Sequence, residues 1–337
     1  MKKDRLTHID IGAGIMIVWV VLFHALGMGR EIEQGHSVEN MCIIFPYLHF
    51  FMPWFFYKSG VFFKKCNNRK LLWKKDIYKF LKPFIIWSIV GYGLFLLFAW
   101  HGNYLTLHKA TYSVLYNFVL NGSIPINEVL WFLLSLCLVR WIANELIPFK
   151  DDKRFIIKCI FIVVACYLIT ILLHLLNHHL QPRYIANVFS GLAFYSIGFC
   201  LRDIENNKWV ILISFIIFVC GCFCGFTIVD MWPNKLLTGH YMLWIPTSVC
   251  GIIVFNSLCR YLTYLELLKN GFSTIGRFAM PIYVTHAIII IIISEVIVYL
   301  QDSTLQQNAS YIILGSCIVC LTLICMIWKR IASKHIL

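Results

Sequence analysis

Hydrophobic residues along this chain fall into long runs that polar residues rarely interrupt. A run of about 20 apolar residues is long enough to cross a lipid bilayer as a helix. The regular apolar–polar alternation that predicts the strands of a membrane barrel is absent. The pattern therefore predicts an all-α bundle of about ten membrane-spanning helices, near residues 9–28, 45–63, 83–100, 129–148, 155–176, 185–201, 209–229, 242–262, 278–299 and 310–328.

Basic residues between these runs gather on alternate sides. If the N-terminus is cytoplasmic, 24 of the 29 Lys and Arg residues lie on the cytoplasmic side, four lie outside and Lys58 lies within a span. Cytoplasmic segments of membrane proteins are enriched in Lys and Arg, so we expect both termini in the cytoplasm. The same bias accounts for the formal net charge of +13 without a nucleic-acid partner.

The composition supports a membrane protein and limits the other classes. Hydrophobic residues make up 60% of the chain and charged residues only 13%, against about a quarter charged in soluble domains. No internal repeat and no linker rich in proline or serine divides the chain. We therefore expect residues 1–337 to form a single integral-membrane domain.

The cysteines and clustered histidines do not predict a metal site. Nearly all of the fourteen cysteines lie within apolar runs, where they are expected to act as small packing residues. Cys220, Cys222 and Cys224 form the tightest group, but at helical spacing their thiols do not converge. His174 and His178 are one turn apart and are a candidate ligand pair, yet no carboxylate lies near them in the sequence.

His24 is the first candidate for chemistry. It lies about 15 residues into the first span, or about 22 Å along a helix, which places it in the outer half of the bilayer. A neutral imidazole there can act as a general base toward a hydroxyl, or can simply bind a neighbouring helix. Asp10 shares its helix face but lies about 21 Å away, so the two cannot form a dyad. A carboxylate in the first turn also suits the helix dipole.

Further candidates lie on the second and ninth predicted spans and in the loop between the second and third. Lys58 either extends to the membrane interface or binds an anion in a cavity that opens to the cytoplasm. The basic segment from Lys64 to Lys82, which includes Lys79, predicts either an interfacial helix or a phosphate-binding surface for a nucleotide-bearing donor. His286 follows Thr285 within an apolar helix, where such residues more often join helices than catalyse.

Four segments, in this order, resemble acyltransferase family 3, which includes bacterial O-acetyltransferases of surface glycans. They are Ile9-Asp10 with Gly14-Ile15 and His24; Met52 to Gly60 with the basic tail to Lys82-Pro83; Leu130-Trp131-Phe132-Leu133; and Ile275 to His286. Their order and spacing agree with the family over nearly the whole chain.

The resemblance implies a multi-pass O-acyltransferase, an O-acetyltransferase above all, in the inner membrane of a bacterial cell. Cytoplasmic acetyl-CoA or another acyl-CoA would be the co-substrate, with no bound cofactor, and a hydroxyl of a surface or lipid-linked glycan would be the acceptor. His24 would be catalytic and Lys58, Lys79 and Lys82 would bind the donor. The expected supporting residues are Asp10, Trp131 and His286.

One position departs from the family, and two other classes of function stay open. Ala13 occupies the position, eleven residues before His24, at which the family usually has Lys or Arg, and Lys58 is a candidate substitute. A transporter or flippase of glycan intermediates would use His24, Lys58 and His286 as a proton relay. The repeated halves and broken helices often seen in transporters are absent. An inactive sensor or scaffold would be favoured if Ala13 abolishes activity.

Overall fold

The computed structural model describes residues 7–33, 50–101, 112, 114–116, 118–119, 122–124, 126–148, 152, 154–175, 183–226 and 241–334. Within these residues every element is helical apart from one isolated bridge between Ile124 and Asn127, which confirms the predicted all-α class. Contacts divide the chain into two compact units, which we describe separately: residues 1–46 with 255–337, and residues 47–254. The division does not test whether the chain is one domain.

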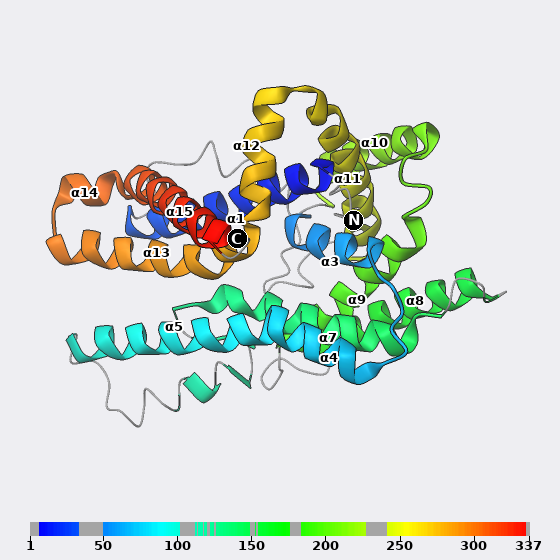
Figure 1. Cartoon of the computed structure of the whole chain (residues 1–337), viewed down its shortest axis with the longest axis horizontal. Coiled ribbons are helices and arrows are strands. Elements are labelled where there is room, and N and C mark those ends of the chain that lie inside the picture. Colours follow the sequence, from blue (N-terminus) through cyan, green and yellow to red (C-terminus); the bar gives the residue numbers. More distant parts are fainter. Residues whose placement is uncertain are drawn as a thin grey trace. The chain divides into compact units, whose positions relative to one another are not determined.

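Helices of the first unit come from both ends of the chain (Figure 1). They are α1 (Thr7–Ile32), the C-terminal part of α11 (Tyr241–Tyr261), the short 3₁₀ turn η4 (Leu262–Tyr264), α12 (Glu266–Arg277), α13 (Ala279–Leu300), α14 (Ser303–Gln307) and α15 (Ala309–Lys334). The first helix packs against α12, α13 and α15. At its C-terminal end, the buried Glu33 carboxylate accepts the backbone N–H of Ser310 at 2.7 Å and so anchors the start of α15.

The crossing of α1 and α12 depends on two glycines. A Cβ added at Gly14 would lie 2.1 Å from the carbonyl oxygen of Phe272, and one added at Gly276 would lie 1.8 Å from that of Asp10. The two backbones therefore approach more closely than any side chain allows, as is common between membrane helices. The amphipathic helix α12 was not anticipated in the sequence, because its pattern is too short and too polar to predict a span.

The second unit contains α3 (Phe51–Val61), α4 (Arg69–Asp76), the π-helical segment η2 (Ile77–Leu81), α5 (Lys82–His101), the 3₁₀ turn η3 (Glu128–Leu130), α7 (Trp131–Leu146), α8 (Phe155–Leu175), α9 (Arg183–Leu201), α10 (Lys208–Phe223) and the N-terminal part of α11. The central helix is α9, which contacts α3, α7 and α8. A Cβ at Gly60 would lie 1.9 Å from the Tyr195 carbonyl oxygen, and one at Gly198 would lie 2.2 Å from that of Tyr57. This unit is therefore also built on a close crossing with a glycine on each helix.

Seven of the described helical stretches are long and apolar enough to cross a membrane: Thr7–Gly29, Arg69–Phe98, Glu128–Leu146, Phe155–Leu173, Leu243–Tyr264, Ala279–Leu300 and Ala309–Met326. Asn187–Leu201 and Lys208–Phe223 are apolar but shorter. Each of the ten predicted spans overlaps a helix, although residues 45–49 of the second, 176 of the fifth and 227–229 of the seventh lie outside the described part. The chain is therefore a multi-pass membrane protein. The number of crossings and the side of the membrane on which each terminus lies stay predictions.

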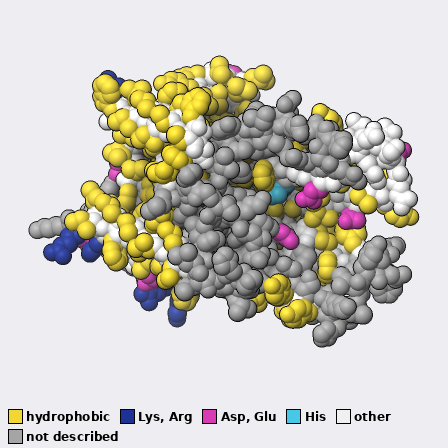
Figure 2. Space-filling view, turned by 180° about the vertical axis from the view of Figure 1, so that it is seen from behind, with side chains coloured by type: hydrophobic (Ala, Val, Ile, Leu, Met, Phe, Trp, Pro, Cys, Tyr) yellow, Lys and Arg dark blue, Asp and Glu magenta, His cyan; other side chains and the backbone are white. Residues whose placement is uncertain are grey.

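The outer surfaces of the helices are apolar, as a lipid-facing protein requires. Phe161 on α8 and Phe215 on α10 are largely exposed, together with many leucine and isoleucine side chains. On the face drawn in Figure 2, most of the described side chains are hydrophobic and the Lys and Arg side chains lie in a few small groups. Exposed apolar surface of this extent is unfavourable in water and favourable in contact with lipid chains.

Candidate functional site

His24 lies on the last third of α1 and is partly exposed. Its Nδ1 is 2.8 Å from the carbonyl oxygen of Val20, one turn earlier on the same helix. A carbonyl oxygen only accepts hydrogen bonds, so Nδ1 carries the proton of the neutral ring. The lone pair of the neutral imidazole therefore lies on Nε2, which is the arrangement that a general base requires.

His286 on α13 lies next to His24 and is fully buried. The centres of the two imidazole rings are 5.1 Å apart and the rings are tilted by 58°. Its Nδ1 is 2.7 Å from the carbonyl oxygen of Tyr283 and 3.2 Å from that of Ile282, so this ring also carries its proton on Nδ1. The structure thus brings together two histidines that are 262 positions apart in the sequence.

The inner end of the same helix holds Asp10 and Ala13. The Asp10 carboxylate is mostly buried, and its Oδ2 lies 3.8 Å from Nε of Arg277 at the end of α12. Ala13 precedes Gly14, at which α12 makes its close approach. Arg277 was not singled out in the sequence as a partner of Asp10, because only the short helix α12 brings it there.

Lys58 lies near the end of α3, in the second unit, and both it and Glu205 are buried. The Lys58 ammonium donates to Glu205 Oε1 at 3.2 Å, and the hydroxyl of the fully buried Tyr57 donates to Oε2 at 3.1 Å. Glu205 follows α9 and had not been identified from the sequence. The available signal was chemical: a lysine within an apolar helix needs a carboxylate partner, and the chain has only 16 acidic residues.

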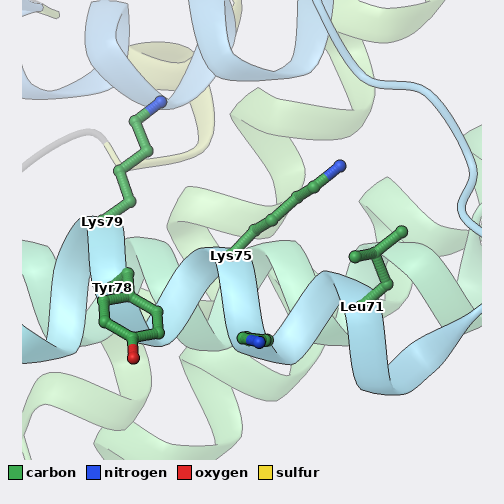
Figure 3. A pocket seen from close by; sticks show the side chains of 5 residues that line it. Leu71, Lys75, Tyr78 and Lys79 are labelled. Atoms are coloured by element: carbon green, nitrogen blue, oxygen red, sulfur yellow. The ribbon is translucent and has the colours of Figure 1, made fainter.

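A basic groove of about 490 Å³ lies along α4 and η2, lined by Leu71, Lys74, Lys75, Tyr78 and Lys79. Lys75 and Lys79 extend to the same side of this helical stretch (Figure 3). Three ammonium groups beside an aromatic ring and an apolar side chain suit a ligand that carries phosphates. Lys82 does not line the groove, and its ammonium lies 5.8 Å from the centre of the Tyr78 ring.

The groove is held in place by contacts to α7. Asp76 is almost completely buried and accepts from Nε of Arg140 at 3.0 and 3.1 Å. Before α4, Asn144 pairs with the backbone of Cys66 at 2.8 and 3.1 Å. The Asn68 side chain caps α4 by accepting the N–H of Leu71 at 3.0 Å. These contacts fix both ends of α4: the start through Cys66 and Asn68, and the end, just before η2, through Asp76.

The π-helical segment η2 places Lys79 within a distorted stretch of helix. Pro83 lacks the N–H that would bind the Lys79 carbonyl in a regular α-helix, and its ring would clash with that carbonyl. The backbone instead opens before the proline, and the N–H of Lys82 binds the carbonyl of Ile77, five residues earlier. Single π turns of this kind often occur at functional sites.

Two other sequence candidates are placed as follows. Trp131 begins α7, is buried, and packs edge-on against Phe132 with ring centres 6.1 Å apart. His178 and His179, and the side chain of His174, lie outside the described residues. Among the described residues, the cysteines are free thiols and no three His, Cys, Asp or Glu side chains are close enough to hold a metal ion.

Comparison with known proteins identifies the family. A family model described as an acyltransferase domain matches residues 7–330, which is nearly the whole chain and includes both histidines and the basic groove. No curated protein and no solved structure matches the chain. The resemblance seen in the four sequence segments is confirmed by this match, and the chain belongs to acyltransferase family 3.

Proposed function

We propose that this membrane acyltransferase moves an acyl group, acetyl above all, from acyl-CoA in the cytoplasm to a hydroxyl of a surface or lipid-linked glycan in the bacterial inner membrane. The observation that carries the proposal is His24. Its ring is partly exposed within a membrane-spanning helix, and the Val20 carbonyl fixes the tautomer that leaves Nε2 basic. A hydroxyl is the substrate group that such a base activates.

In the proposed reaction, Nε2 of His24 takes the proton of the acceptor hydroxyl while the oxygen attacks the thioester carbonyl carbon. The new C–O bond forms and the C–S bond breaks. The departing thiolate takes the proton from His24 and leaves as the free thiol of coenzyme A. The histidine is neutral again, and no metal or bound cofactor is required.

The donor's phosphates are proposed to bind the basic groove of the second unit. Lys79 supplies a cation there, and Lys82 lies three residues further along, and of the three predicted donor residues these two are proposed to bind the phosphates. Lys74 and Lys75 add two more ammonium groups.

Lys58 has a second candidate role beside donor binding. Because its ammonium already binds the Glu205 carboxylate, a donor phosphate would have to share or replace that partner. Donor binding by Lys58 therefore has to be tested apart from its role in the buried pair. A double variant that removes the charges of both Lys58 and Glu205 separates the two roles.

The test measures transfer of radiolabel from [acetyl-¹⁴C]acetyl-CoA by the purified protein in nanodiscs. The acceptor is the glycan-containing membrane fraction of source cells from which the gene has been deleted. We expect His24→Ala to bind acetyl-CoA normally but to lose about 10² to 10⁴ in transfer rate. The matched control is His8→Ala, which removes the other histidine of α1.

The outcomes separate the classes of function. Transfer by His24→Ala at the wild-type rate would refute His24 as the base. A flippase or an inactive scaffold would give no label transfer even with the wild-type protein. Repeating the assay with longer acyl-CoA donors identifies the acyl group that is used.

A further inference from the structure

His286 has one nitrogen whose role the proposed reaction does not explain. Its Nδ1–H binds the backbone carbonyls of α13, but its Nε2 is buried and has no hydrogen-bond partner among the residues that the structure describes. Buried polar atoms nearly always have a partner, so this nitrogen is an acceptor whose donor has to be sought among its neighbours.

His24 is the neighbour that can supply this donor. Two imidazoles joined by an N–H···N hydrogen bond of about 2.9 Å have ring centres roughly 5 Å apart, and the observed separation is 5.1 Å. In the neutral state both rings carry their proton on Nδ1, so neither Nε2 has a proton to share. A proton is available only when His24 becomes an imidazolium. His24 is partly exposed and His286 is not, so a substrate meets His24 first.

We propose that His286 is a positioning residue for His24: its Nε2 accepts a hydrogen bond from the Nε2–H that His24 gains during acyl transfer. The proposal rests on the proposed function, because it takes His24 to be the base. It gives the second histidine a role in the chemistry, whereas the sequence favoured a role in helix packing.

The proton follows a closed path in this scheme. His24 takes the proton from the acceptor hydroxyl and then has an N–H on each nitrogen. The Nδ1–H stays on the Val20 carbonyl. The Nε2–H first faces the substrate oxygen, which stops being basic once it belongs to the ester. His286 Nε2 is then the acceptor for this N–H, until the thiolate removes the proton. His286 itself gains and loses no proton.

The first experiment compares two substitutions at this position. His286→Leu fills similar space without an acceptor, and His286→Gln keeps an acceptor oxygen on a side chain of comparable reach. Loss of one hydrogen bond to a charged group predicts that Leu lowers the kcat of label transfer about 10- to 100-fold and leaves the KM for acetyl-CoA unchanged. Gln should restore most of the rate. Equal impairment by Leu and Gln, or a wild-type kcat for Leu, would overturn the proposal.

A double variant separates this proposal from the proposed function. If His286 acts only through His24, then adding His286→Leu to His24→Ala should slow the residual transfer no further. Additive losses would indicate a purely structural role. If His24→Ala itself retains full activity, the base assignment fails. If His24→Ala is inactive and His286→Leu is fully active, only the present inference fails.

A measurement on the wild-type protein covers the case in which the Leu variant does not fold. Protein labelled with ¹⁵N-histidine in nanodiscs is acidified until His24 is protonated. We expect its Nε2–H to show scalar coupling to a nitrogen of a second imidazole, and His286→Gln to abolish that coupling. A protonated His24 without coupling to another ring nitrogen would contradict the proposal.

Discussion

The two units use the same way of packing helices but treat their buried polar groups differently. Each contains a close crossing made by one glycine on either helix: Gly14 with Gly276, and Gly60 with Gly198. Beyond its crossing, the first unit places His286 against His24, two neutral imidazole rings, whereas its buried carboxylates, Asp10 and Glu33, lie towards the two ends of α1. The second unit buries charges as matched pairs, Lys58 with Glu205 being the most enclosed.

This difference indicates a division of work. A general base must change its protonation during the reaction, and a nearby fixed charge would bias that change. Paired charges cannot change partners cheaply, so they suit the positioning of elements such as the basic groove. Four predictions test this comparison, from the largest expected effect to the smallest.

Removing one member of the buried charge pair should have the largest effect on folding. Lys58→Met leaves the Glu205 carboxylate buried without its ammonium partner, which predicts a loss of about 3–5 kcal/mol in the free energy of unfolding. Adding Glu205→Gln should restore most of the stability, as measured by thermal unfolding in detergent. If the double variant is stable yet binds acetyl-CoA more weakly than wild type, Lys58 also contacts the donor. Unchanged stability of Lys58→Met would contradict the pairing.

Substitutions at the glycine crossings should come next. Gly14→Ala or Gly276→Ala forces a methyl group into a backbone carbonyl and should destabilise the protein by about 1–3 kcal/mol. Each helix provides its own control, because a Cβ at Gly27 of α1 or at Gly271 of α12 would meet nothing within 4 Å. At these controls alanine should be neutral or stabilising, since it favours helix by up to about 1 kcal/mol. Similar unfolding temperatures for crossing and control variants would count against the close approach.

Neutralising the groove should affect donor binding rather than folding. We expect Lys74→Gln with Lys75→Gln to weaken acetyl-CoA binding about 3- to 10-fold, since each exposed contact contributes up to about 1 kcal/mol. The wild-type affinity should fall as salt is added, and the variant's should fall less steeply. Lys208→Gln removes an exposed lysine of α10 and serves as the control. A double variant with wild-type affinity and salt dependence would place the phosphates elsewhere.

The exposed pair of the first unit should have the smallest effect. Lys269 donates to Glu266 at 2.9 Å, and this hydrogen bond lowers the pKa of the carboxyl below its ordinary value of 4.5. The pair's contribution to stability is therefore complete above pH 4.5 and is lost as the pH falls through the lowered pKa of the folded state. Because Glu266 is exposed, Glu266→Gln should leave the unfolding temperature at neutral pH unchanged within error. A clear decrease would show that exposed pairs matter here.

The elements set by local pattern could be predicted, and those set by contacts between distant segments could not. Apolar runs located the long helices, and His24 stood out because an ionisable ring is costly within such a run. Its partner could not be identified, since only the packing of α13 on α1 brings His286 beside it. Lys58 likewise signalled a buried charge, but the sequence did not reveal that Glu205 is its partner.

The basic segment shows the same limit at shorter range. Its charge predicted a phosphate-binding surface or an interfacial helix, and the structure contains a helix with a groove that holds three of its lysines. Which lysines share the groove depends on the π turn, and a π turn follows from how a backbone relieves the strain before Pro83 rather than from any pattern of apolar residues.

The π turn at Ile77–Leu81 also decides which side of the molecule the groove lies on. It accommodates one residue more than an α turn, so every residue before it is rotated by about 100° relative to a regular continuation of α5. The lysines of α4 therefore point in a different direction around the helix axis from the one they would have if the regular helix Lys82–His101 continued through this turn. Converting this turn to a regular α turn without removing a residue would keep the charge, the apolar length and the composition of both helices unchanged, yet would turn the groove about a quarter of the way around the helix axis.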